Sequence, residues 1–542
     1  MRKILLLLIA FSGLWLCAEI KFLAQGLPID DAYIFKRYSV NLAEGAGFSF
    51  NPDEPSLGCS SFLWAVLLAG LVKIFGKESY YLIAQWSGMI FTMLGIWLLL
   101  KMILKHTQGL LTVLAGGFFA WFSSITFMNS ISGMENGLFA FLVMTNIYYF
   151  DESQKPGAGS GFKLGILAGL AFLTRPEGIY FLIAMIIIWF FSLFRKERIS
   201  FSWIFFYLIG FALMGFPYLY WLKQNFHQWL PYTYLAKIYS TDPGFLERSF
   251  ERKIFDGANF LVYGWWLIIK PWKIVGILVF LSAIIGLFYA LWGFFRKDKE
   301  WSLTKAGGWL FLPFVYGYSF PVTPHFGGYY QRYISSVWLV MILLSIVGMD
   351  KIYNQFFARF KLLKWSKGLI YLIGLILAII YCYPIVSGQI KEGKKVYCQE
   401  VQLNEGLRMD SAKYLASHTK PEAKILVGYT GLGVVGGEAD RYIYDLGALI
   451  NLDLLPYLKG TMPMTEKRWS RILDYICDKK IDYYVSFAPI LGPDPAIFPG
   501  FLEIARFSSA PKPKEPIQEI RVYIINRVLL CGERKTKEWG ER

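Results

Sequence analysis

Two adjacent carboxylates, Asp30 and Asp31, follow the first apolar segment of the chain. Acids at the end of an apolar helix lie at the membrane–water interface, where they need not be buried in hydrocarbon. An enzyme that acts on a lipid-linked substrate needs its general base at this depth, and a carboxylate is suited to that role. Asp30 and Asp31 are therefore the first candidates for chemistry.

The composition is typical of a polytopic membrane protein. The chain of 542 residues is 55% hydrophobic and 17% charged, and its mean hydropathy is +0.42. Its net charge of +16 would suit a nucleic-acid-binding protein. We exclude that class because the positive charges form short clusters between apolar runs. This is the pattern of cytoplasmic loops that follow the positive-inside rule.

The apolar runs predict about eleven membrane-spanning helices. The basic N-terminus and the apolar run that follows it indicate a retained transmembrane helix with its N-terminus in the cytoplasm. Residues 61–76 are short for a span, because about 20 residues are needed to cross a bilayer. If they lie in the interface or re-enter, every strong basic cluster falls inside. The expected spans are 1–23, 81–100, 109–128, 137–150, 162–174, 178–194, 201–222, 272–295, 306–320, 335–349 and 367–387.

This topology gathers charged residues on the outer face, at helix ends or in loops. Ionisable groups at membrane depth are costly and usually functional. The residues that share this side are Asp30, Asp31, Glu54, Glu135, Arg175, Glu177, Lys237, His325 and Arg332.

The chain changes character near residue 390. Residues 1–389 are expected to form the transmembrane domain, with a first external loop over about 25–80, and 390–542 an α/β domain outside the membrane. Strands expected at 423–431, 441–447, 481–487 and 521–527 alternate with helices at 410–418 and 468–480. Any two of Cys398, Cys477 and Cys531 could form a disulfide in an extracytoplasmic domain, and the sequence does not select the pair.

A glycine-rich segment in this domain, GLGVVG, matches a dinucleotide-binding pattern at Gly431, Gly433 and Gly436. The residues that follow it, GEADR, do not begin an apolar-periodic crossover helix. We therefore interpret the segment as a glycine-rich turn.

Five blocks of the sequence carry a family resemblance. DDAYIFKRYSVNLAEGAGFSFNP resembles the first external loop of GT-C membrane glycosyltransferases, and is most similar to the terminal arabinofuranosyltransferases of mycobacterial cell walls and their bacterial relatives. SGMENGLFA, LTRPEG and YYQRY follow in the family's order, and VGYTGLGVVGGEADRYIYDLGAL is similar to its soluble domain. SLGCSSFLW and LPYTYLAK depart from the family pattern. The first block fits at Asp30, Asp31, Arg37, Asn41, Gly45, Gly47, Asn51, Pro52 and Glu54.

The resemblance implies an inverting transfer of a sugar from a polyprenyl-phosphate donor to a cell-envelope glycan, lipid or protein. Nucleotide sugars are lacking outside the cytoplasm, so a lipid must carry the donor. The acceptor hydroxyl needs a general base, and we expect Asp30 to be that base, as the family pattern also favours. Asp31 would either orient the acceptor or raise the basicity of Asp30 through like-charge proximity.

The leaving phosphate needs cationic partners, and arginine binds it through two parallel hydrogen bonds. Arg332 and Arg175 are the candidates, with Lys237 and His325 behind them. Arg332 could instead be an interfacial anchor, and Arg175 could form a structural ion pair with Glu177.

Glu135 could position the acceptor, pair with Arg175, or hold a divalent cation such as Mg²⁺ or Mn²⁺ together with Asp30 or Asp31. The remaining candidates for positioning sugar or acceptor are Glu54, Glu177 and Arg37.

Two other classes make different demands on the sequence. A transporter or flippase for a lipid-linked glycan predicts acids near the membrane midplane and inverted repeats. A membrane receptor would not need the acids Asp30, Asp31 and Glu135. The acids lie at helix ends and no internal repeat is visible, so the sequence favours a transferase.

Overall fold

A computed structural model gives the fold. It describes residues 26–52, 54–107, 110–152, 157–193, 199–229, 276–286, 335–352, 391–428, 431–458, 466–488, 495–509 and 518–536, together with a few isolated positions that include Arg332.

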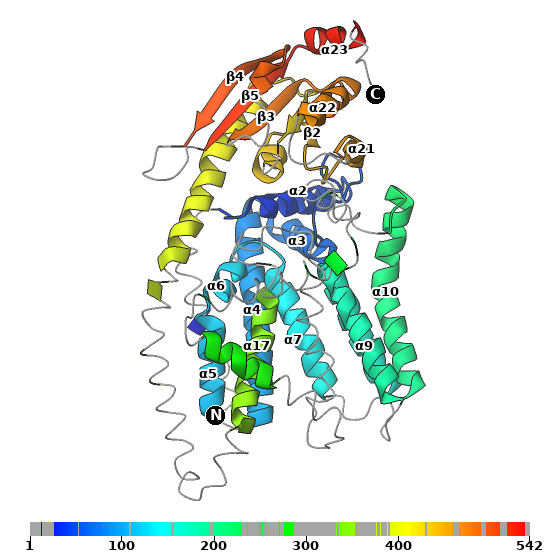
Figure 1. Ribbon diagram of the computed structural model, residues 1–542, viewed down its shortest axis with the longest axis vertical. Helices are drawn as coiled ribbons and strands as arrows, with labels where there is room; N and C mark the ends of the chain where they lie inside the picture. Colours follow the sequence, from blue (N-terminus) through cyan, green and yellow to red (C-terminus); the bar gives the residue numbers. More distant parts are fainter. Residues whose placement is uncertain are drawn as a thin grey trace, which may run out of the picture.

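The apolar runs of the sequence form helices that stand side by side in the lower part of the molecule (Figure 1). Two of them, Lys77–Thr107 and Phe201–Phe226, are long and apolar enough to cross a membrane, among the residues that the structure describes. The helices are α4 (Tyr80–Thr107), α5 (Leu110–Trp121), α6 (Ser124–Ser130), α7 (Asn136–Glu152), α8 (Ala158–Thr174), α9 (Ile179–Ser192), α10 (Phe201–Phe226) and α17 (Ser335–Ile352).

Most of these helices agree with the predicted spans, and one differs. The single span expected over 109–128 is two helices, α5 and α6, which are separated at residues 122–123. The spans predicted at 306–320 and 367–387 lie outside the described residues, and the first and the eighth lie largely outside them. The count of eleven and the orientation of the termini stay predictions.

The segment that was predicted to be the first external loop is itself largely helical. Helix α2 (Asp30–Glu44) begins at the two acids, which suit the positive end of a helix dipole, and ends at Gly45 in a left-handed conformation. Helix α3 (Phe62–Phe75) begins at Ser61, whose hydroxyl accepts from the amide of Trp64. Figure 1 shows α2 lying across the helices, between them and the C-terminal sheet.

The C-terminal region, which was predicted to be an α/β domain, contains a mixed five-stranded sheet. Its order is β2-β1-β3-β5-β4, in which β1 pairs in parallel with β2 and β3, and β5 pairs antiparallel with β3 and β4. The strand β4 was missed from the sequence. The strands are β1 (Lys424–Val427), β2 (Tyr442–Asp445), β3 (Tyr483–Ala488), β4 (Phe501–Ser508) and β5 (Glu519–Ile525).

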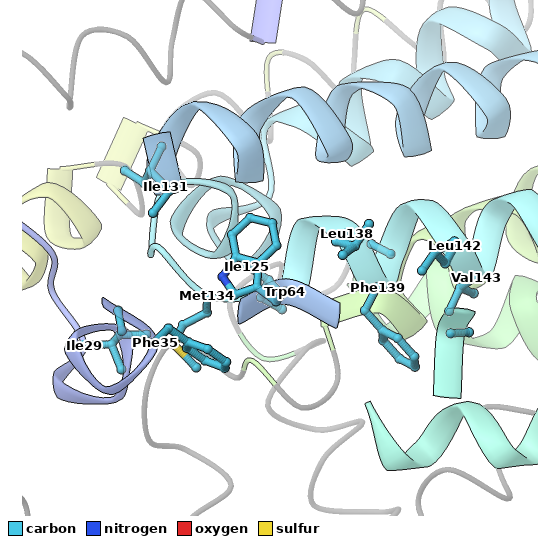
Figure 2. Close-up of a cluster of buried hydrophobic side chains, with 14 of the residues drawn as sticks. Ile29, Phe35, Trp64, Ile125, Ile131, Met134, Leu138, Phe139, Leu142 and Val143 are labelled. Atoms are coloured by element: carbon cyan, nitrogen blue, oxygen red, sulfur yellow. The ribbon is translucent and has the colours of Figure 1, made fainter. Parts of the chain in front are cut away.

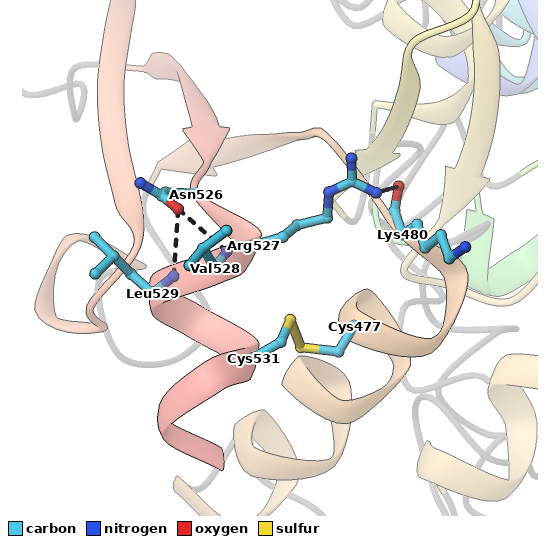
Figure 3. Close-up of a disulfide and its surroundings, with 7 residues drawn as sticks. All are labelled: Cys477, Lys480, Asn526, Arg527, Val528, Leu529 and Cys531. Atoms are coloured by element: carbon cyan, nitrogen blue, oxygen red, sulfur yellow. Dashed lines mark hydrogen bonds between the residues drawn. A yellow bond between two sulfur atoms is a disulfide. The ribbon is translucent and has the colours of Figure 1, made fainter. Parts of the chain in front are cut away.

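Helices complete this region. Residues 391–418 form a continuous helix that leads to the sheet and ends with α20 (Met409–His418); it contains a π-helical segment, η6 (Leu403–Arg408). α22 (Glu466–Lys479) and α23 (Arg527–Thr536) carry the disulfide Cys477–Cys531 (Figure 3). This pairing is one of the three that the sequence allowed.

One apolar core joins the segment around α2 to both parts of the chain. Ile29 and Tyr33 are buried in the same cluster as Val434 and Ile443 of the C-terminal region. On the other side, Figure 2 shows Ile29 and Phe35 in one cluster with Trp64 of α3 and with residues of the segment before α7. The side chains of α2 are thus held from both sides.

Candidate functional site

The first component of the site is an ion pair between Asp31 and Arg332. Nη2 of Arg332 donates to Oδ2 of Asp31 at 2.7 Å. The Asp31 side chain is 36% exposed, whereas that of Arg332 is 6% exposed. Arg332 is placed by the start of α17, because the hydroxyl of Ser335 donates to the Arg332 carbonyl at 3.0 Å. The structure thus brings the first and the last transmembrane motif blocks together at a position that solvent reaches.

Asp30, the neighbour of Asp31, is buried and faces the C-terminal region. Its Oδ2 accepts from the amide of Gly433 and its Oδ1 from the amide of Val434, both at 2.9 Å. Arg408 lies 3.7 Å from Oδ1. Burial raises the pKa of Asp30 above its usual range, and Arg408 and the two amides oppose that rise. Adjacent residues of a helix point about 100° apart, which separates the two acids.

The glycine-rich segment forms the amide site for Asp30. It is a short π-helix, η7 (Leu432–Gly436), whose backbone lies directly against the start of α2. A Cβ atom at Gly433 would lie 1.9 Å from the carbonyl oxygen of Asp30. Only glycine allows this approach. The motif that resembled a nucleotide-binding loop therefore binds a carboxylate of the same chain.

A second charged cluster surrounds Arg175 and is fully enclosed. Its Nη1 donates to Oε1 of Glu135 at 2.7 Å, and its Nη2 to Oε1 of Glu177 at 3.2 Å. The three side chains are between 1% and 7% exposed. Asn136 accepts a further bond from Nη1 at 3.2 Å. The structural ion pair that was considered for Arg175 and Glu177 is present, and so is the pairing of Glu135 with Arg175.

The turn before α7 connects this cluster to α2. Gly133 has a φ of +79°, and a Cβ atom at that position would lie 3.3 Å from Cβ of Ala32. The indole of Trp64 donates to the Gly133 carbonyl at 3.0 Å. The block that contains Glu135 therefore packs beside the residue that follows Asp31.

Two other predicted site residues, Arg37 and Glu54, lie where the first loop meets the C-terminal region. Nε of Arg37 donates to the carbonyl of Phe50 at 3.0 Å, and the Tyr442 hydroxyl donates to Glu54. Glu54 thus connects the loop to β2, whereas Arg37 connects α2 to residue 50 of the same loop. Lys237 and His325 lie outside the described residues.

Sequence reasoning missed the contribution of residues 404–408. Asn404 donates to the Leu27 carbonyl at 2.8 Å, and Tyr33 donates to Glu405 at 2.5 Å. Together with Arg408, these residues of η6 contact the start of α2. The sequence offers no local signal for them, because the contacts join positions more than 370 residues apart.

The carboxylates proposed as metal ligands do not converge. Asp30 accepts from two backbone amides, Asp31 accepts from Arg332, and Glu135 accepts from Arg175. Within the described ranges, no three His, Cys, Asp or Glu side chains form a group that could hold a metal ion. These residues do not fit a bound cation, so the mechanism proposed below routes no step through a metal.

Part of the chain matches a known family. Residues 59–221 match the model of the dolichyl-phosphate-mannose-protein mannosyltransferases. The match covers less than half of the chain. No curated protein sequence matches the chain significantly.

Solved structures match nearly the whole chain. ArnT from Cupriavidus metallidurans bound to undecaprenyl phosphate is 11% identical over 95% of this chain and 97% of its own, with a TM-score of 0.54. The oligosaccharyltransferase of Archaeoglobus fulgidus with Zn and sulfate is 12% identical over 92% and 72%, with a TM-score of 0.57. AglB from the same organism, with an inhibitory peptide and a dolichol-phosphate, is 10% identical over 90% and 69%, with a TM-score of 0.54.

The chain has the GT-C fold. The solved structures that share this fold are 10–12% identical to the chain and show its fold, and the family model matches residues 59–221. The arabinofuranosyltransferase-like assignment stays a prediction. The Asp31–Arg332 pair joins the first motif block to Arg332, whereas the Arg175 cluster forms from the blocks SGMENGLFA and LTRPEG.

Proposed function

We propose that the protein transfers a sugar from a polyprenyl-phosphate donor to a cell-envelope glycan, lipid or protein on the outer face of the membrane, with inversion at the anomeric carbon. The observation that carries the proposal is the ion pair of Asp31 with Arg332 at the start of α2. It combines a solvent-accessible carboxylate with a cation suited to phosphate. The two structural relatives that were bound to undecaprenyl phosphate and dolichol-phosphate support a lipid-phosphate donor.

We assign the general base to Asp31 instead of Asp30. Both oxygens of Asp30 already accept backbone amides, whereas Asp31 is reached by solvent. In the proposed step, the acceptor oxygen attacks the anomeric carbon and its proton passes to Asp31. The bond from that carbon to the phosphate oxygen breaks, and its electron pair leaves with the polyprenyl phosphate.

Arg332 is proposed to bind the leaving phosphate. A guanidinium has five N–H donors in a planar fork, so one arginine can contact Asp31 and a phosphate at the same time. The base and the leaving phosphate would then bind different N–H groups of one guanidinium, on opposite sides of the anomeric carbon, as inversion requires. Negative charge grows on the phosphate during transfer, and a preorganised cation stabilises that charge. Lys237 and His325 remain further proposed phosphate ligands.

The proposed localisation is the cell membrane, with a cytoplasmic N-terminus and an external C-terminal region. The disulfide Cys477–Cys531 supports an external location, because disulfides persist in oxidising compartments. Basic clusters such as the one at 195–198 support a cytoplasmic location for the opposite helix ends. A reporter fused at Arg195 should be cytoplasmic and one at Asp440 external; a cytoplasmic signal at Asp440 would contradict this arrangement.

A transport function is the second candidate, and one experiment separates the two. The purified protein is placed in liposomes with undecaprenyl- or dolichyl-phosphate-linked sugars and an extract of cell-envelope glycans and lipids. The proposal expects free polyprenyl phosphate to form only when acceptor is present. Passage of the intact lipid-linked sugar across the bilayer, without its cleavage, would support a flippase and overturn the transferase.

A further inference from the structure

The start of α2 is bound by residues of the C-terminal region. Asp30 is bound by the amides of Gly433 and Val434, which lie 403 and 404 residues away in the sequence. Arg408 approaches the same carboxylate at 3.7 Å. The C-terminal region therefore contacts the residue adjacent to the proposed base.

Two more contacts hold the flanks of this turn. On the N-terminal side, Asn404 donates to the Leu27 carbonyl at 2.8 Å. On the C-terminal side of α2, the Asn51 side chain donates to the Ile443 carbonyl and accepts from the Ile443 amide, both at 2.9 Å. The side-chain amide of Asn51 thus makes with Ile443 the pair of hydrogen bonds that a neighbouring strand would make at the edge of β2. The segment around α2 is thus fixed to the C-terminal region at these three places, in addition to the contacts of Tyr33 and Glu54 described above.

Both π-helical segments among the described residues contribute to these contacts with α2 and the residues before it. η6 carries Asn404 and Arg408, and η7 carries Gly433 and Val434. A π-helical turn exposes backbone groups or redirects side chains that a regular helix would not, and it occurs frequently at functional sites. Here the amides of η7 face a carboxylate at the first turn of α2.

We infer that the C-terminal region is part of the catalytic centre, in which Gly433, Val434 and Arg408 anchor Asp30 and thereby aim Asp31 at Arg332. Asp30 and Asp31 are consecutive residues of one helical turn, so a rotation that releases Asp30 also moves Asp31. Asp30 is then a positioning residue. The inference rests on the proposed function for its catalytic part, while the anchoring itself is independent of the reaction.

The anchor explains a buried acid that the proposed chemistry does not use. A buried carboxylate is costly unless hydrogen bonds or a counter-charge compensate it. Asp30 has two amide donors and a nearby guanidinium, which compensate its burial. These contacts have a defined geometry and join α2 to the C-terminal region. A displacement of about 1 Å in a catalytic group can lower a rate by about 100-fold, so such an anchor has a measurable effect on catalysis.

The test compares Asp30→Asn and Arg408→Gln with Asp445→Asn. Asp445 is a matched control: it is a buried aspartate of the same region whose two oxygens accept from the amides of Gly447 and Leu449. Hydrogen–deuterium exchange is followed in peptides that cover 26–44 and 431–437. Transfer is measured with undecaprenyl-phosphate-linked sugars, as kcat and as KM for the donor.

We expect Asp30→Asn to raise exchange in both peptides together and to lower kcat by about 10-fold, with little change in the donor KM. Arg408→Gln should act in the same direction, Arg408→Lys should restore part of the loss, and the double variant should be less than additive. Asp445→Asn should raise exchange near residues 445–449, leave the 26–44 peptide unchanged and lower kcat less than Asp30→Asn does, because Asp445 contributes only its charge near Asp30 and Asp31.

Three results would overturn the inference. Loss of transfer in Asp30→Asn with unchanged exchange would make Asp30 a chemical participant, and raised exchange with unchanged kcat would remove its positioning role. Unchanged exchange together with unchanged kcat would show that Asp30 neither anchors α2 nor positions Asp31. If the wild-type protein transfers no sugar, the proposed function fails by itself, and the exchange of 26–44 in Asp30→Asn still decides whether the anchor exists.

Discussion

Two arginines of this protein bind carboxylates in contrasting surroundings. Arg175 lies between Glu135 and Glu177, and all three side chains are enclosed. Arg332 binds Asp31, whose side chain is 36% exposed. The sequence presented both arginines as candidate phosphate ligands. Their surroundings separate them, because a phosphate that binds Arg175 would have to displace two buried acids, whereas one that binds Arg332 meets a carboxylate open to solvent.

The difference indicates how this protein uses its charged motifs. A buried cation with two acids fixes the segments that carry them, here the turn before α7 and the short helix η2 (Pro176–Gly178) between α8 and α9. A cation whose partner is exposed can change partners during a reaction. We therefore interpret the Arg175 cluster as the support and the Asp31–Arg332 pair as the reacting part.

The largest expected effect is on folding. Arg175→Ala leaves Glu135 and Glu177 buried without their cation, which should cost about 3–5 kcal/mol of stability. Thermal unfolding of the detergent-solubilised protein measures this loss. Arg332→Ala should lose less, because Asp31 keeps its contact with water. Equal losses for the two variants would remove the distinction between support and reacting pair.

The next effect is on chemistry. Asp31→Asn keeps the shape of the side chain but cannot accept a proton, so transfer should fall by at least about 100-fold while the protein still inserts and folds. Asp30→Asn should lower transfer less. Expression and exchange profiles serve as the control for folding. If Asp30→Asn abolished transfer and Asp31→Asn did not, the base would be Asp30, as the sequence first indicated.

The third effect concerns the donor phosphate. Arg332→Ala should reduce kcat/KM for the lipid-phosphate donor by about 10- to 150-fold, the value of one charge-assisted contact of about 1.5–3 kcal/mol. Arg332→Lys should recover part of this loss, because it restores the charge without the planar fork. Steady-state kinetics with varied donor give both values. Unchanged donor kinetics in Arg332→Ala would move the phosphate site elsewhere.

The smallest effect tests a buried acid that is held by backbone amides. Burial raises the pKa of Asp445 to about 6, and the charges of Asp30 and Asp31 add to that rise. A pKa that is raised in the folded state favours folding below the ordinary value of 3.8, and this stability is lost as the pH rises through about 6. Asp445→Asn cannot ionise, so its unfolding midpoint should change by roughly a few degrees less than that of the wild type over this pH range. If the unfolding midpoints of the variant and the wild type depended on pH in the same way, the raised pKa of Asp445 in the folded protein would be contradicted.

The sequence alone determined much of the secondary structure. Long apolar runs predicted α4, α7, α8, α9, α10 and α17, because a bilayer-length run of apolar residues has few other stable conformations. Runs of apolar residues bounded by turns predicted β1, β2, β3 and β5 in the same way. Two adjacent acids at the end of an apolar segment were also sufficient to propose a site at this position.

One strand, β4, had no signal of this kind. Its outward face carries the exposed Leu502 and Ile504, while Glu503 lies on the half-buried face. The usual alternation of apolar inside and polar outside is therefore reversed over these positions. The strand is placed by its antiparallel pairing with β5, which is a tertiary contact.

Only the tertiary structure decided what each charged residue does. Nothing in the local sequence distinguishes Asp30 from Asp31, yet one binds Gly433 and Val434 and the other binds Arg332. The cause is helical geometry: neighbours on one turn point about 100° apart, so they meet different partners. Those partners lie about 300 and 400 residues away, and their positions depend on how all the intervening helices and strands pack. Local patterns fix which residues form helices and strands, and the packing of those elements fixes which acid is held and which remains open to solvent.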